Sequence, residues 1–210
     1  MRSTLGGVFG LPDGINEAGL SIASLWLPVS QYPLSQSSTN PVIYNSNLVD
    51  WALGNFDTVE SLQSAINSIT VANINEIVSQ LNLPLHYVVS DSSGANIIIE
   101  FTNQSMQVYE SNNAVLTNAP AYPYHNVATP LGSILPSDFA SASTDKPEDL
   151  DYTQWGVIRD HKELVYYFFT QFNNNLFSVD LKKIDFSQAQ ASTVSVIQPN
   201  WQTDITSSLS

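Results

Sequence analysis

Residues 13–28 read DGINEAGLSIASLWLP, and they combine a turn with the first strand that the sequence predicts. Pro12, Asp13 and Gly14 are residue types that favour turns, whereas residues 20–27 are mostly apolar and end at Pro28. A short apolar run between turn signals is typical of a buried strand. We therefore predict that the chain enters its core through a strand at residues 20–27.

Two helical patterns follow a polar loop at residues 35–40. Within residues 42–56, the apolar side chains recur at a spacing closer to that of a helix than of a strand. A second helix is predicted to begin at Asp57, whose carboxylate can accept amide hydrogens of the first turn, with Glu60 completing a capping box. One face of this helix is expected to be apolar, formed by Val59, Leu62, Ala65, Ile66 and Ile69.

A predicted hairpin follows the helices. Residues 85–90 and 95–102 have strand patterns, and the segment DSSG at residues 91–94 tolerates the tight backbone of a turn. Residues 106–109 and 114–116 could extend the same sheet. The hairpin is therefore expected to be the centre of an antiparallel sheet.

The second half of the chain contains loops and then more strands. Residues 118–150 are rich in Pro and Ser and are expected to form loops. Further strands are predicted at residues 155–160, 164–172 and 176–181, with residues 173–175 turning the last pair. A strand, two helices and then a run of strands indicate an α+β fold, in a single domain that covers residues 1–210.

The charge and the lack of cysteine exclude several classes of function. Six basic and 19 acidic side chains give a net charge of −13, which repels nucleic acid phosphates and anionic membrane surfaces. The sequence contains no cysteine, so these residues hold no disulfide, no thiolate metal site and no cysteine nucleophile. No segment reaches the roughly 20 apolar residues that cross a bilayer. We expect neither nucleic acid nor membrane as a partner.

The compartment is left open by the sequence. Charged residues are only 12% of the chain, so the polar surface must consist mainly of Ser, Asn, Gln and Thr, a composition that favours a soluble protein. Residues 1–10 lack the long apolar core of a signal peptide, although a start inside a longer gene would also remove such a signal. The protein would be periplasmic or secreted if an upstream signal has been lost.

Common catalytic and metal-binding motifs are absent from the sequence. It has no glycine-rich phosphate loop, no Gly-x-Ser-x-Gly motif and no histidine pair at metal-ligand spacing. His86, His125 and His161 are scattered, whereas a zinc site needs three or four converging ligands. The acidic run at residues 148–151 is more typical of a solvated loop than of paired-carboxylate catalysis. We therefore assign no metal and no cofactor.

Three segments become informative when they are considered together. They are residues 13–20 (DGINEAGL), 25–28 (LWLP) and 115–120 (VLTNAP), supported by residues 85–87 (LHY), 91–94 (DSSG), 152–155 (YTQW) and 166–168 (YYF). In order and spacing they resemble the choloylglycine hydrolase family, which includes bile salt hydrolases and penicillin V acylases. The resemblance implies an N-terminal nucleophile hydrolase fold, a four-layer αββα sandwich, which is incomplete in this chain.

The resemblance also implies a reaction and two site residues. In this family an N-terminal cysteine attacks a linear amide, and its own α-amino group acts as the base. The oxyanion that forms needs preorganised donors. By residue-to-residue correspondence these donors are the side-chain amide of Asn118 and the backbone amide of Trp26. The alternative for Asn118 is a turn-capping residue before Pro120.

The sequence departs from the family pattern in two ways. The family places its nucleophile some tens of residues before the Asp-Gly-x-Asn-Glu turn, and that portion is missing here. The chain is also shortened between residues 118 and 135 and again after residue 143. Ser3 and Thr4 lie too close to Asp13 to replace the cysteine. We expect the C-terminal part of an amidase, which is inactive alone.

Substrate class and the alternative function follow from the same comparison. Trp26 occupies a position where a large aromatic side chain should favour a flat or apolar acyl group over a hydroxylated steroid conjugate, so phenoxyacetyl amides or N-acyl homoserine lactones are expected. The alternative is a noncatalytic remnant that keeps the fold and binds ligands. Missing strands would expose sheet edges, which favours a homo-oligomer.

Overall fold

A computed structural model of the chain describes residues 12–112, 116–123, 155–170, 173–187, 202–204 and 206. The chain divides into two compact units, Met1–Ala128 and Thr129–Ser210, which are described separately. The single domain expected over residues 1–210 stays a prediction.

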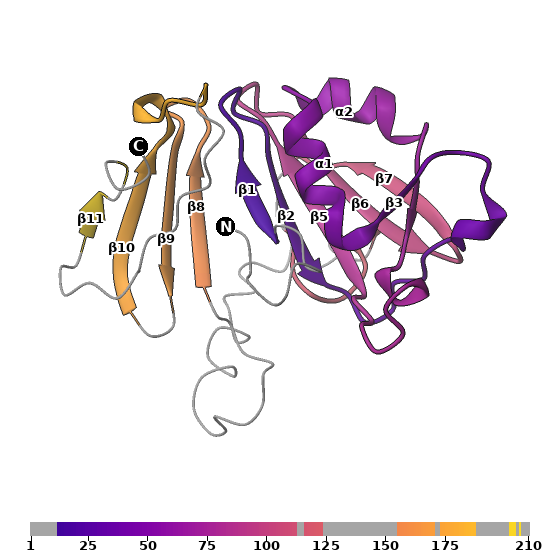
Figure 1. Cartoon of the computed structure of the whole chain (residues 1–210). Helices are drawn as coiled ribbons and strands as arrows, with labels where there is room; N and C mark the ends of the chain where they lie inside the picture. The colour runs from indigo at the N-terminus through magenta and orange to yellow at the C-terminus, as the bar shows by residue number, and fades with distance from the viewer. Residues whose placement is uncertain are drawn as a thin grey trace. The chain divides into compact units, whose positions relative to one another are not determined.

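Within residues 12–112, the first unit contains a five-stranded antiparallel sheet and two α-helices (Figure 1). In spatial order its strands are β1 (Asp13–Ile15), β2 (Ser21–Trp26), β5 (Leu85–Ser90), β6 (Asn96–Thr102) and β7 (Ser105–Glu110). The helices are α1 (Leu48–Asn55) and α2 (Val59–Ile66), and β3 (Val42–Tyr44) pairs in parallel with β4 (Thr70–Ala72). The strand predicted at residues 20–27 and the hairpin predicted at residues 85–102 are confirmed.

The DGINEAGL segment forms the turn between β1 and β2 and attaches it to α1. Asn16 Oδ1 accepts hydrogen bonds from two backbone amides of this turn, while Asn16 Nδ2 donates to the carbonyl oxygens of Leu53 and Phe56 at 3.0 and 2.8 Å. Gly19 has φ 88°, a conformation that favours glycine. At Gly14 a Cβ atom would lie 2.6 Å from Leu53 Cδ1. The segment therefore has a structural role.

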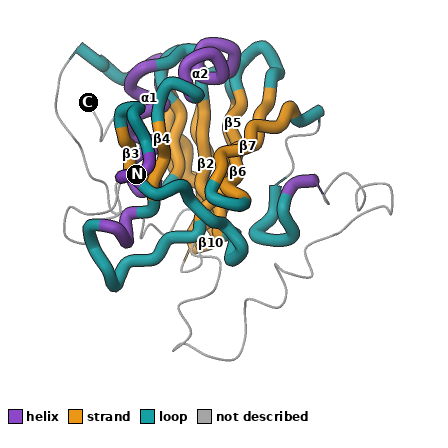
Figure 2. Tube along the Cα trace, turned by 90° about the vertical axis from the view of Figure 1, so that its right-hand side faces the viewer, coloured by secondary structure: helices purple, strands orange, loops and turns teal. Residues whose placement is uncertain are grey.

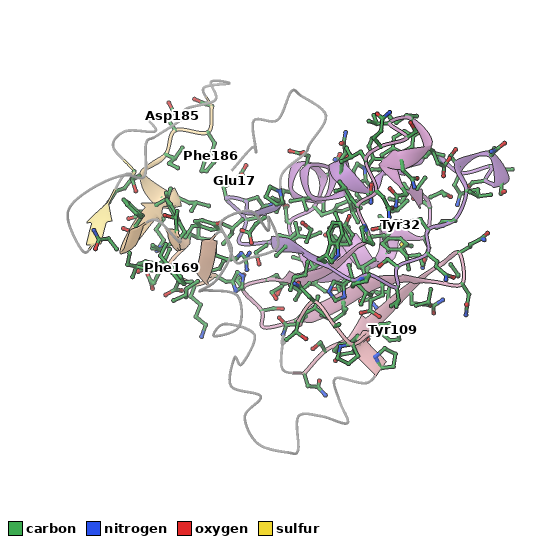
Figure 3. All side chains as sticks on the ribbon, turned by 90° about the horizontal axis from the view of Figure 1, so that it is seen from below. Glu17, Tyr32, Tyr109, Phe169, Asp185 and Phe186 are labelled. Carbon is green, nitrogen blue, oxygen red and sulfur yellow. The ribbon has the colours of Figure 1, made fainter. Side chains whose placement is uncertain are left out.

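Helices α1 and α2 cover one face of the sheet (Figure 2). The core between them contains Leu48, Val49, Ala52, Val59, Leu62 and Ile66 from the helices and Ile22, Tyr87, Val89, Ile97, Ile99 and Phe101 from the strands. These strand residues alternate with side chains of the opposite face, as the pleat requires. In Figure 3, Tyr32 lies on the side of the helices, whereas Tyr109 lies on the other side of the sheet.

Two local predictions need correction. Residues 42–56 do not form one helix, because residues 42–44 are the strand β3. This strand pairs with β4, at residues 70–72. The N-cap of α2 is Thr58 rather than Asp57, and Ser61 rather than Glu60 completes the capping box. Thr58 and Ser61 offer the same hydroxyl chemistry one residue further along, so the sequence pattern was ambiguous. The buried face at Val59, Leu62 and Ile66 is confirmed.

The second unit contains a four-stranded sheet in the order β11 (Gln202–Asp204), β10 (Asn173–Asp180), β9 (Val165–Thr170) and β8 (Trp155–Asp160). Phe168 and Phe177 stack at its centre with ring centroids 5.2 Å apart. The three predicted strands are confirmed, but residues 173–175 continue β10 instead of forming a turn. Asn173 is the register partner of Thr170, so the connection is only residues 171 and 172.

The described ranges contain no helix long and apolar enough to cross a membrane. In the second unit, the residues that the structure describes form strands and one 3-10 turn, Leu181–Lys183, without an α-helix.

Candidate functional site

The backbone amide of Trp26 lies on the β1 side of β2. Along β2 the N–H groups face the two neighbours alternately. Leu27 donates to the carbonyl oxygen of Pro84, beside β5, at 2.7 Å, whereas Ser24 donates to that of Pro12, beside β1, at 2.8 Å. Trp26 follows Ser24 by two residues, so its N–H has the same direction as that of Ser24. Because β1 pairs only with the first half of β2, the Trp26 amide needs another acceptor.

This acceptor is the side chain of Asn118, 92 residues further along the chain. The Trp26 nitrogen lies 3.2 Å from Asn118 Oδ1, and both residues are exposed. The structure thus brings together Trp26 and Asn118, the two site residues that the family resemblance implies. The side-chain hydrogen bond within this turn comes from Thr117, whose hydroxyl donates to the carbonyl oxygen of Ala119 at 2.9 Å. The oxyanion-binding role of Asn118 and Trp26 stays a prediction.

The contact defines what this site can do chemically. An anion that accepts a hydrogen bond from the Trp26 amide would have to lie about 2.9 Å from its nitrogen, which is the position now taken by Asn118 Oδ1. For an anion to bind there, the Asn118 side chain would have to move off the Trp26 amide and direct its Nδ2 donor toward the anion. Two donors would then share one acceptor, as the stabilisation of a developing negative charge requires.

Tyr32 holds the strand end next to Trp26. Its hydroxyl donates to the carbonyl oxygen of Leu85 at 2.8 Å and accepts from the Leu85 amide at 3.1 Å. Leu85 is the register partner of Trp26. Burial raises the pKa of Tyr32 to about 12, so the hydroxyl stays protonated at neutral pH and can both donate and accept. Sequence patterns did not single out Tyr32, because its partner lies 53 residues away.

The structure describes two of the three histidines, His86 and His161. His86 is fully buried and contacts Glu100, His161 is half-buried in the second unit, and His125 lies outside the described residues. Across the described part of the chain, no three His, Asp or Glu side chains gather as metal ligands would. The segment at residues 135–143, where the sequence is shortened, also lies outside the described residues.

Comparisons with known proteins identify similar sequences. The family model described as linear amide C–N hydrolases, choloylglycine hydrolase family, matches residues 1–132. A bile salt hydrolase/transferase of Clostridium perfringens is 38% identical over 120 residues, which cover 54% of this chain and 35% of that protein. A penicillin V acylase of Pectobacterium atrosepticum is 26% identical over 259 residues, covering 94% of this chain and 69% of that protein.

A solved structure shows the same fold. The penicillin V acylase from Agrobacterium tumefaciens superposes with a TM-score of 0.72 at 21% identity, covering 98% of this chain and 78% of that one. The α+β fold of N-terminal nucleophile hydrolases that the sequence predicted is thereby confirmed. The chain spans about a third of the bile salt hydrolase that it matches. The 259 residues aligned with penicillin V acylase exceed the 210 of this chain, in agreement with the predicted internal shortening.

Proposed function

The chain belongs to the choloylglycine hydrolase family of linear amide hydrolases, and on this premise we propose that it forms the oxyanion-binding part of an amidase. Attack on an amide carbonyl converts its oxygen into an oxyanion. The Trp26 N–H and the Asn118 side-chain amide would donate hydrogen bonds to this oxygen. The observation that carries the proposal is their contact, with 3.2 Å between the Trp26 nitrogen and Asn118 Oδ1.

The nucleophile is the part of the reaction that these 210 residues do not supply. The sequence contains no cysteine, so the thiol of the family reaction would have to come from residues beyond this sequence. The purified chain is therefore expected to release no product from penicillin V above a blank without protein. Robust turnover would overturn this assignment, because it would require another nucleophile within the chain.

Anion binding can be measured without turnover. Phenoxyacetate, the carboxylate released when penicillin V is hydrolysed, would place one oxygen at the oxyanion position. Calorimetry should detect its binding, and Asn118→Ala should weaken it by about tenfold, the effect of losing one hydrogen bond to a charged group. Asn40→Ala, at another exposed asparagine, is the matched control and should leave the affinity unchanged. Equal binding by both variants would contradict the role of Asn118.

The exposed ring of Trp26 supports an aromatic or apolar acyl group as the substrate. Its side chain is 41% exposed, although aromatic side chains usually bury more of their surface. Phenoxyacetate is therefore expected to bind more tightly than glycocholate. Trp26→Asn, which keeps the backbone donor, should weaken phenoxyacetate binding selectively. A preference for glycocholate in the parent chain would contradict this choice of substrate.

A ligand-binding protein without catalysis is the second candidate. Two observations favour it: the sequence has no cysteine, and Asn118 Oδ1 already occupies the Trp26 amide. The upstream coding sequence distinguishes the candidates. An in-frame segment that encodes a cysteine favours the amidase, whereas phenoxyacetate binding by a protein whose translation starts at Met1 favours the binding protein.

A further inference from the structure

The face of the first sheet opposite the helices contains a buried pair of titratable side chains. His86 on β5 and Glu100 on β6 are both fully buried, and His86 Nδ1 lies 2.9 Å from Glu100 Oε1. Strand alternation places them away from Tyr87 and Ile99, which belong to the core under the helices. The proposed oxyanion chemistry uses neither side chain directly.

Glu100 also binds the segment that carries Asn118. The same oxygen, Glu100 Oε1, accepts a hydrogen bond from the Tyr122 backbone amide at 2.9 Å. Tyr122 is buried, and its ring lies 5.5 Å from that of Tyr109 on β7. Asn118 precedes Tyr122 by four residues. The carboxylate therefore attaches this segment to the sheet four residues after Asn118.

His86 connects the pair to the other donor. It follows Leu85, the register partner of Trp26, and is itself the register partner of Leu25. Glu100 Oε1 thus contacts both His86, on the strand that pairs with Trp26, and Tyr122, in the segment that carries Asn118. We propose that Glu100, held by His86, is a positioning residue that keeps the Asn118 side chain beside the Trp26 amide, close enough for both groups to reach one anion. This inference rests on the proposed oxyanion role of the two groups.

Stability alone is a poor explanation for the pair. Removing two polar groups from water is unfavourable, and buried ion pairs can often be replaced by apolar side chains without loss of stability. Among the residues that the structure describes, no partner lies within hydrogen-bond distance of His86 Nε2 or Glu100 Oε2. Burial of incompletely bonded groups is unfavourable, whereas their remaining bonds fix one geometry. Positioning therefore predicts a selective effect of an apolar replacement at the Asn118–Trp26 contact, whereas a purely stabilising role predicts an equal effect on neighbouring amides.

The test is the double variant His86→Leu, Glu100→Met, studied by NMR hydrogen exchange of the full chain. Because Glu100→Met also removes the acceptor of the Tyr122 amide, the urea midpoint should fall slightly, and positioning is tested by the difference between the Trp26 and Leu27 amides. The Trp26 amide should exchange about tenfold faster, which corresponds to a local opening about 1.4 kcal/mol easier. The Leu27 amide, on the same strand but facing β5, should exchange at the parent rate. The Asn118 side-chain resonances should also shift.

Two further variants give the conservative case and the control. In Glu100→Gln the amide oxygen can still accept from both partners, so the protection of Trp26 should be largely retained. Ile98→Val changes a fully buried side chain two residues away on the same strand and face. It should lower the urea midpoint while Trp26 and Leu27 change together. The proposal is overturned if Trp26 and Asn118 in the double variant behave as in the parent, or if Trp26 and Leu27 lose protection equally.

A backbone substitution at Tyr122 tests the proposal if the double variant fails to fold. Replacing Tyr122 by its α-hydroxy acid puts an ester oxygen in place of the N–H that donates to Glu100 and keeps every side chain. The same selective loss at Trp26 is expected, and unchanged Trp26 exchange would overturn the proposal. All of these measurements are made without substrate. Failure of the oxyanion role would appear in phenoxyacetate binding, and failure of positioning would appear here.

Discussion

At the scale of single residues, Asn16 is the residue of the DGINEAGL segment with the most bonds. Its side chain accepts from two amides of its own turn and donates to two carbonyl oxygens at the end of α1. All four bonds use the amide's two donors and its carbonyl oxygen, a combination that aspartate cannot reproduce. The DGINEAGL motif therefore has a structural role, because its Asn16 attaches the turn to α1.

Asn16→Asp should destabilise the first unit. The carboxylate loses both donors, and its negative charge lies beside the C-terminal end of α1, where the helix dipole is also negative. The free energy of unfolding should fall by about 2–4 kcal/mol, measured by urea denaturation. The neighbouring Glu17 is exposed, and Glu17→Gln should change the free energy of unfolding by less than about 0.5 kcal/mol. A loss confined to the Glu17 variant would contradict this assignment.

At the scale of elements, the start of α2 depends on a residue from a distant turn. Asp91 in the β5–β6 turn accepts a hydrogen bond from the Val59 amide, the first of α2, at 2.8 Å with Oδ2, while Oδ1 accepts from Ser93. Burial of Asp91 favours the neutral acid, but hydrogen bonds from Ser93, Val59 and Ala95 outweigh burial and lower the pKa of Asp91 below its usual 3.8.

This lowered pKa predicts how stability depends on pH. Since the folded pKa is below the unfolded value, the contribution of Asp91 is complete above the unfolded pKa and is lost as the pH falls through the folded pKa. Asp91→Asn should cost about 1–2 kcal/mol at pH 7, and the difference from the parent should shrink below about pH 4. Thermal unfolding from neutral to acid pH measures this convergence.

Asp57→Asn is the control for Asp91→Asn. Asp57 is the N-cap that the sequence predicted, but the structure assigns this role to Thr58, and Asp57 is exposed. Its replacement should change stability by only a few tenths of a kcal/mol. A gap for Asp91→Asn that stays constant down to acid pH would contradict the role of the charge.

The sequence predicted the main strands correctly, but it did not predict the structure of the region between β2 and α1. Alternating or apolar runs with turn residues at both ends, such as those of β5, β6 and β9, specify their conformation locally. Residues 42–44 (VIY) have strand-favouring side chains, but a run of three residues is too short to specify a strand locally. They become β3 because β4, far along the chain, offers a parallel edge, and pairing of this kind is a long-range property.

At the scale of the whole molecule, the net charge of −13 should limit stability. Six basic residues cannot neutralise nineteen acidic ones, so the folded chain carries repulsion that salt screens. Raising NaCl from about 0.02 M to about 0.5 M at pH 7 should raise the thermal midpoint by a few degrees. Near the sequence pI of about 4.2 this increase should vanish. A similar increase at both pH values would indicate a cause other than net charge.

The sequence by itself determined the main strands and the α+β class, because side-chain periodicity and turn residues are local properties. Its short motifs resemble those of the choloylglycine hydrolase family, and this resemblance is the source of Trp26 and Asn118 as candidate site residues. Only the tertiary structure decided that the Trp26 amide faces Asn118, that Glu100 holds the Tyr122 amide, and that Asp91 accepts a hydrogen bond from the first amide of α2. Each of these contacts joins residues more than 20 positions apart, and hydrogen bonds across such separations exist only after the sheet has set its register.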